Sequence, residues 1–182
     1  RGLGDVYKRQ RKFQADPVTF TVTDQSTGTV TAVKVLAKDL TVKNPSDGGY
    51  SVSGDSVTIK AMGQGLWATQ TANNVIVSGE NVNRGDGTFT AIVKMSGKTV
   101  NNWDEAGLFI YKDDDNYVAV ERKHGTNSPK VHVVTEANGS ANEDQNTENP
   151  NAEAIWLKLE KSGNTFTGYY SVDKENWTKA GN

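Results

Sequence analysis

The sequence predicts an all-β fold, in which two antiparallel sheets pack face to face as a β-sandwich. Short apolar runs recur roughly every ten residues, and turn signals rich in Gly, Asp and Asn separate them. No segment carries a sustained apolar repeat of about 3.6 residues, the pattern typical of an amphipathic helix. Many short strands without helices between them favour an antiparallel sandwich or barrel.

The individual elements follow from these runs and turns. A first hairpin is expected over residues 18–36, where Val and Phe alternate with Thr on both sides of a turn at residues 24–28. The segment 138–153 is strongly polar, so we expect a long mobile loop there. The strands expected after the first hairpin are residues 50–52, 56–60, 66–69, 74–78, 88–96, 106–112, 117–123, 130–135, 154–160, 165–172 and 176–179.

Three segments of unequal character divide the chain. Residues 1–10 are basic and without periodicity, and we expect a leader foreign to the fold, with an ordinary basic leader as the alternative. Residues 11–38 hold the first hairpin, either the tail of a preceding domain or extra edge strands of this one. Residues 39–182 are expected to form the sandwich.

Composition excludes several classes of function. The net charge of −2 over 182 residues lacks the excess of positive charge that is typical of a nucleic-acid-binding domain. No apolar run approaches the roughly 18 residues that a membrane-spanning helix needs. The chain has no cysteine, which excludes disulfides, cysteine-ligated zinc and thiol catalysis. We therefore expect neither nucleic acid nor a membrane as a partner.

Two hairpin motifs resemble those of a known domain family. The first is AGLFIYKDDDNYVAVERK, residues 106–123, and the second is IWLKLEKSGNTFTGYYSVDKENW, residues 155–177. Together they resemble the concanavalin A-like jelly-roll domain appended to family 43 glycoside hydrolases, of the β-xylosidase C-terminal type. The resemblance covers about residues 39–182. Because such modules usually continue past the position of Gly181, it also implies a jelly roll truncated at the C-terminus.

The resemblance implies a non-catalytic, carbohydrate-binding or accessory module of a secreted bacterial polysaccharide-degrading enzyme. Its partners would be a polysaccharide or oligosaccharide and a catalytic domain in the same parent chain, at an extracellular or cell-surface location. The alternative is a ligand-free structural spacer that packs on the catalytic domain. The Glu-x-Asp-x-x-Glu motif of concanavalin-like glucanases is absent, and His124 and His132 lack partners at motif spacing. We therefore expect no enzymatic activity, no cofactor and structural roles for both histidines.

Aromatic residues beside polar loops are the candidate sugar contacts. A pyranose ring presents an apolar face and a rim of hydroxyls, so it needs an exposed aromatic ring with carboxylates or amides nearby. Trp67 with Asn74, and Trp103 with Glu105, have that chemistry. The alternative is that these rings fill the core, which is the role we expect for Trp156 and Trp177.

Two further candidates lie on the strand expected at 117–123. Tyr117 and Glu121 share one face of it, because residues i and i+4 of a strand point the same way. If Val118 and Val120 face the core, then Tyr117, Ala119, Glu121 and Lys123 face outward, either on a binding sheet or on a merely solvated face.

The acidic tip of the first motif is a weak candidate for a structural calcium ion. Asp113 and Asp115 offer the oxygen ligands that calcium takes, but the full twelve-residue calcium loop is missing. Acidic residues also favour tight turns, and we prefer that interpretation.

Overall fold

The structure is a computed structural model, and every element of regular structure that it describes is a β-strand. It describes residues 12–15, 19–24, 29–34, 40–45, 50–53, 56–60, 65–68, 70–73, 75–78, 88–126, 128–148 and 152–182. Residues 1–10 lie outside this part of the chain. In the same ranges no helix is long and apolar enough to cross a membrane.

The strands are β1 (Lys12–Ala15), β2 (Thr19–Asp24), β3 (Thr29–Lys34), β4 (Leu40–Lys43), β5 (Tyr50–Ser53), β6 (Ser56–Lys60), β7 (Val75–Ser78), β8 (Thr88–Ser96), β9 (Glu105–Asp113), β10 (Asn116–Gly125), β11 (Ser128–Ala137), β12 (Ser140–Glu148), β13 (Ala154–Ser162), β14 (Thr165–Ser171) and β15 (Thr178–Gly181).

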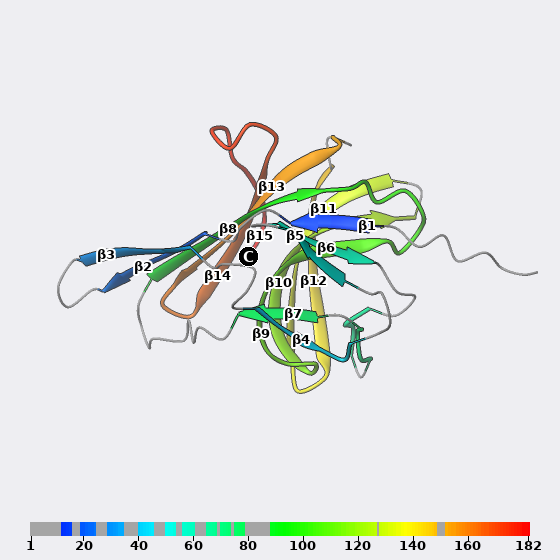
Figure 1. Cartoon of the computed structure of the whole chain (residues 1–182), viewed down its shortest axis with the longest axis horizontal. Coiled ribbons are helices and arrows are strands. Elements are labelled where there is room, and N and C mark those ends of the chain that lie inside the picture. The colour runs from blue at the N-terminus through cyan, green and yellow to red at the C-terminus, as the bar shows by residue number, and fades with distance from the viewer. Residues whose placement is uncertain are drawn as a thin grey trace, which may run out of the picture.

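Two antiparallel sheets form the body of the molecule (Figure 1). The large sheet has the order β15-β14-β13-β8-β1-β6-β5, with β2 paired to β8 and β3 to β2. The small sheet has the order β12-β11-β10-β9, and β4 and β7 form a separate pair. Val75 of β7 packs against an apolar cluster that includes Tyr117 and Val134 of the small sheet. The predicted all-β, two-sheet antiparallel sandwich is therefore confirmed. The division of the chain near residue 38 stays a prediction.

The core lies between the two sheets and follows from strict alternation. On β8, every second side chain from Phe89 to Met95 is buried, and the residues between them are only partly so. Ile155, Leu157 and Leu159 of β13 meet this row, and Leu108, Val120, Val131 and Val133 of the small sheet close the core from the other side. Ile92 lies on the opposite face of β8 from this row and is half-buried, outside this core.

Two element predictions also need correction. Residues 66–68 belong to a loop, and no strand forms in that described stretch. The expected loop at 138–153 contains β12, which pairs with β11 across a tight turn in which Asn138 and Gly139 both have positive φ. That dipeptide is the strongest short hairpin signal. A strand at the edge of a sheet needs few apolar residues, which explains its polar sequence.

Candidate functional site

The outer face of the small sheet, turned away from the core, carries a cluster of charged side chains. Cross-strand register brings them together, because Glu105 of β9 is opposite Lys123 of β10, and Glu121 of β10 is opposite His132 of β11. Glu143 of β12 pairs with Val134, two residues beyond His132 on the same face. We call Glu105, Glu121, Lys123, His132 and Glu143 the charged floor.

Close contacts link the members of the charged floor. Lys123 Nζ lies 2.8 Å from Glu143 Oε2 and 3.3 Å from Glu105 Oε1. The His132 ring lies between two carboxylates, with Nε2 3.4 Å from Glu121 and Nδ1 3.5 Å from Glu143. Among the described residues, neither imidazole nitrogen has a hydrogen-bond partner, and Glu143 Oε1 also lacks a donor. Buried polar atoms without partners are uncommon, and they mark this floor as a place with unused hydrogen-bonding capacity.

Gly107 makes room for one member of this floor. It pairs with Glu121 in the register of β9 and β10. A Cβ atom placed on Gly107 would come within 2.4 Å of Glu121 Cγ and 2.5 Å of the Val120 carbonyl oxygen. The Glu121 side chain thus lies across the glycine toward its neighbours, a position that any other residue at 107 would obstruct.

Two indole rings stand above the charged floor. The Lys123 ammonium lies 5.0 Å from the centre of the Trp103 ring and 5.9 Å from that of Trp67. Both distances are within the range of cation–π attraction. The rings remain accessible, with 67% of Trp103 and 39% of Trp67 exposed. Two exposed aromatic rings therefore flank a buried ionic cluster.

Hydrogen bonds to the sheet hold the segment that carries Trp67. The Tyr117 hydroxyl donates to the Leu66 carbonyl at 2.8 Å, and the Ala68 N–H donates to Glu136 Oε2 at 3.0 Å. Leu66 also packs into a small apolar cluster with Tyr117, Ala119 and Val134. Ala68 has a φ of 56°, a left-handed conformation that costs energy in a non-glycine residue. The surrounding contacts must therefore maintain this loop.

The Trp103 loop is fixed in a similar way. Asp104 Oδ2 accepts hydrogen bonds from the backbone N–H groups of Val100 and Asn101, at 3.1 and 2.9 Å. The backbone N–H of Trp103 donates to the His124 carbonyl at 2.8 Å, and the backbone N–H of His124 donates to the Asp104 carbonyl at 2.9 Å. Trp103 itself has a φ of 70°. Strained backbone recurs at residues that carry function, and here it sets the direction of an exposed ring.

Burial and neighbouring charges shift the pKa values of Glu105 and Lys123. Desolvation and the neighbouring Glu121 charge raise the pKa of Glu105 to about 7, although Lys123 and His132 oppose the shift. Desolvation lowers the pKa of Lys123, but the carboxylates of Glu143 and Glu105 outweigh it and leave that pKa raised. Near neutral pH the Lys123 ammonium is thus charged, whereas Glu105 is divided between its acid and its carboxylate.

Comparison with known proteins places the chain in a family. The family model described as "Protein of unknown function (DUF1349)" matches residues 44–180. The chain belongs to the DUF1349 family. Its structure is similar to the crystal structure of a functionally unknown protein from Saccharomyces cerevisiae, with a TM-score of 0.59 and 18% sequence identity over 80% of this chain and 79% of that one. This likeness shows the fold alone. No curated protein matches the sequence.

The structure of this DUF1349 chain brings together five of the residues predicted as sugar contacts. Trp67, Trp103, Glu105, Glu121 and Tyr117 all lie on or above the outer face of the small sheet. As predicted, Tyr117 and Glu121 share the face opposite Val118 and Val120. That face is not a solvated one, because Tyr117, Glu121 and Lys123 are buried. Tyr117 consequently anchors a loop and cannot stack on a ligand. Asn74 lies outside the described residues.

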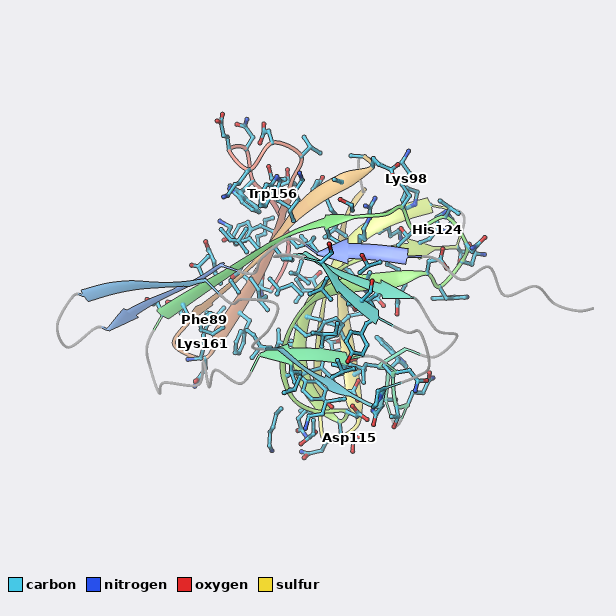
Figure 2. The ribbon with its side chains drawn as sticks, in the orientation of Figure 1. Phe89, Lys98, Asp115, His124, Trp156 and Lys161 are labelled. Carbon is cyan, nitrogen blue, oxygen red and sulfur yellow. The ribbon has the colours of Figure 1, made fainter. Side chains whose placement is uncertain are left out.

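The acidic tip of the first motif is remote from this site. Figure 2 shows Asp115 at one end of the small sheet, whereas His124, which contacts the Trp103 loop, lies at the other. Asp113 Oδ1 accepts hydrogen bonds from Asp115 N at 3.1 Å and Asn116 Nδ2 at 2.7 Å, the contacts expected of a turn. Among the described residues, no group of three or more metal-binding side chains could hold an ion.

Two members of the charged floor were not among the predicted site residues. His132 was interpreted as structural, and Glu143 was placed in a mobile loop. The Asn138-Gly139 turn was the available signal, because it pairs Ala137 with Ser140 and so sets Glu143 opposite Val134.

Trp156 and Trp177 are not core residues. Trp156 lies on the opposite face of β13 from the buried Ile155 and Leu157, with the ammonium groups of Lys94 and Lys174 at 5.7 and 4.7 Å from its ring. Trp177 is half-buried beneath Lys158, whose ammonium lies 4.7 Å from its ring. Strict alternation explains the error for Trp156, since a neighbour of Leu157 must face the other way.

Proposed function

We propose that the outer face of the small sheet binds carbohydrate, and that the chain is a non-catalytic module of a secreted bacterial polysaccharide-degrading enzyme. One observation carries the proposal: the exposed rings of Trp67 and Trp103 flank a buried polar floor. Stacking on an indole covers the apolar face of a sugar, while Glu105 at the edge of the floor accepts hydrogen bonds from its hydroxyls. The resemblance to the module of family 43 glycoside hydrolases supports the same proposal.

The arrangement of the carboxylates favours binding over hydrolysis. A glycosidase needs two carboxyl groups that reach the same glycosidic bond. On the charged floor, the Glu105 side chain is 24% exposed, whereas those of Glu121 and Glu143 are 8% and 11% exposed and lie against His132 and Lys123. We therefore expect the purified chain to leave xylan, arabinan and aryl glycosides intact. Turnover that survives purification and disappears in Glu105→Gln or Glu121→Gln would contradict this expectation.

A glycan array followed by calorimetry tests the binding proposal. For a ligand bound in the micromolar to millimolar range, Trp103→Ala or Trp67→Ala is expected to weaken binding about tenfold, through the loss of roughly 1–3 kcal/mol of buried apolar contact. Trp156→Ala is the matched control, because it removes an indole from the other sheet. It should leave the affinity unchanged.

The alternative is a ligand-free spacer whose small sheet packs on a catalytic domain. An array without a ligand, or ligands whose affinity does not depend on Trp67 and Trp103, would overturn the proposal and favour the spacer.

A further inference from the structure

The charged floor is unevenly charged. It holds three carboxyl groups, on Glu105, Glu121 and Glu143, against one lysine and one histidine. Lys123 is already paired with two of these carboxylates. Glu136, buried on the same face beside the Trp67 segment, adds a fourth acidic side chain. A surface on which charges of one sign predominate attracts ligands of the opposite sign.

Buried acceptors on this face also lack donors. Within the part of the chain that the structure describes, Glu143 Oε1 and Glu136 Oε1 have no hydrogen-bond partner, and the Glu136 side chain is almost fully buried. The nitrogens of His132, fully buried, face carboxylates without hydrogen-bonding to them. Glu136 bonds the Trp67 segment and Glu143 bonds the Lys123 ammonium beneath both rings, so these atoms lie around the proposed site. The two carboxylate oxygens lack N–H donors, which an ammonium group provides.

The indole rings of Trp67 and Trp103 can also attract a cation. Indole is the aromatic side chain that best attracts positive charge through its face. Trp67 and Trp103 are already arranged around one ammonium group, that of Lys123. Both rings remain accessible from the solvent side. Glu105 is the most accessible carboxyl group of the floor, and its Oε2 lies 3.6 Å from where a Cβ of Gly65 would be, in the segment that leads to Trp67.

Resting on the proposed carbohydrate binding, we propose that this site selects aminated glycans. One sugar ring stacks on Trp103 or Trp67, and an ammonium group on that sugar or its neighbour pairs with the Glu105 carboxylate. Uronic acids, which carry a carboxylate, are disfavoured.

Three trisaccharides with one β-1,4-linked glucose backbone test the selection by calorimetry. Cellotriose is neutral, the fully deacetylated chitosan trimer replaces each 2-hydroxyl with an ammonium group, and the C6-oxidised trimer carries carboxylates. The chitosan trimer is expected to bind about fivefold more tightly than cellotriose, the gain of a partly exposed ion pair, and the oxidised trimer more weakly than both. Glu105→Gln should bind the chitosan trimer and cellotriose with about equal affinity, so that the advantage of the chitosan trimer is lost. Glu160→Gln, on β13, is the matched control and should preserve the advantage.

A chitosan trimer with permanent trimethylammonium groups isolates the protein's own titration. Glu121, Lys123, His132 and Tyr117 are the titratable groups that face Glu105 from β10 and β11. Because the pKa of Glu105 is about 7, its carboxylate forms between pH 6 and pH 8. Affinity for this trimer should rise several-fold over that range in the wild type and stay flat in Glu105→Gln.

The outcomes separate the two proposals. If cellotriose binds in a Trp103-dependent way but the chitosan trimer binds no better, carbohydrate binding stands and selection for amines is overturned. Equal binding of the oxidised trimer, or an advantage that persists in Glu105→Gln, overturns it as well. If none of the three trimers binds and an array ligand depends on Trp103, the preference for aminated glucans is wrong. If no ligand depends on Trp67 or Trp103, both proposals fail together.

Discussion

Glu105 combines three properties that rarely coincide in one surface carboxylate. It begins a strand, contacts the Lys123 ammonium, and is largely buried beside the Glu121 charge. Burial disfavours the charged form, and the ion pair with Lys123 only partly offsets that cost. The result is an acidic group that titrates near neutral pH, at the point where a ligand would meet the floor.

This titration makes a prediction about stability. In the folded chain Glu105 holds its proton up to about pH 7, whereas the unfolded group releases it near 4.5. The folded state therefore binds more protons between these values, and its unfolding free energy falls as pH rises. Glu105→Gln removes this dependence. We expect the difference in unfolding free energy, variant minus wild type, to increase by on the order of 1–3 kcal/mol as the pH rises from 4.5 to 7.5.

Urea unfolding of both proteins at several pH values checks this expectation. The Glu160→Gln variant controls for the loss of a carboxylate elsewhere. Parallel profiles for wild type and Glu105→Gln would show that Glu105 titrates normally in the folded chain.

At the scale of elements, the loop segment that carries Trp67 is held in position by side chains of β10 and β11. Residues 65–68 form no strand of their own, yet their carbonyl and N–H groups bond to Tyr117 of β10 and Glu136 of β11. The position of the Trp67 ring above the floor therefore depends on side chains of the sheet below it.

Tyr117→Phe tests this dependence. The change keeps the ring in its apolar cluster but removes the hydroxyl that donates to the Leu66 carbonyl. Loss of one buried hydrogen bond should cost about 1–2 kcal/mol of unfolding free energy. Hydrogen exchange at the Ala68 N–H should quicken, while exchange in the Trp103 loop stays as in wild type. Equal exchange in both proteins would show that Glu136 and Leu66 packing suffice to hold the segment.

The strands that could be predicted are those whose apolar runs and turn residues lie next to one another in the sequence. The hairpins of β9–β10 and β13–β14 were predicted because apolar runs flank turn residues, and both form. β12 was missed because an edge strand can be polar, and its pairing depends on β11 rather than on its own composition. The segment 66–69 was expected to be a strand because it is apolar, but Leu66 is buried against the face of the sheet instead.

The site was predictable only in part, for a related reason. Period-two alternation placed Tyr117 and Glu121 on one face, and the chemistry of sugars pointed to Trp67 and Trp103. Which strands pair with β10 decides the rest, because His132 and Glu143 come from β11 and β12. These strands follow β10 through short turns, so the Asn138-Gly139 turn, if recognised, would have set the register that brings Glu143 to the charged floor.

At the scale of the whole molecule, the two sheets come into close contact at Gly168 of β14. A Cβ atom there would lie 2.4 Å from Val133 Cγ2 and 3.0 Å from Val120 Cγ2, both on the small sheet. The spacing of the sandwich at this point therefore depends on the absence of a side chain. Because Val133 is a near neighbour of His132 along β11, a shift of the small sheet here would also move the charged floor.

A double-mutant cycle tests whether this contact sets the spacing of the sheets. Gly168→Ala should destabilise the chain by about 1–3 kcal/mol, the usual cost of overpacking a core. Val133→Ala should also destabilise it, because it removes buried methyl groups and leaves a cavity. In the double variant the new methyl group of residue 168 occupies the space left at 133. Its loss of stability should then be smaller than the sum of the single losses by on the order of 1 kcal/mol.

Gly125→Ala is the matched control, since a Cβ there meets its neighbours at ordinary distances of 3.7 Å or more. Strictly additive losses, measured by urea unfolding of the four proteins, would show that the sheets adjust freely at this point and that Gly168 does not determine their separation.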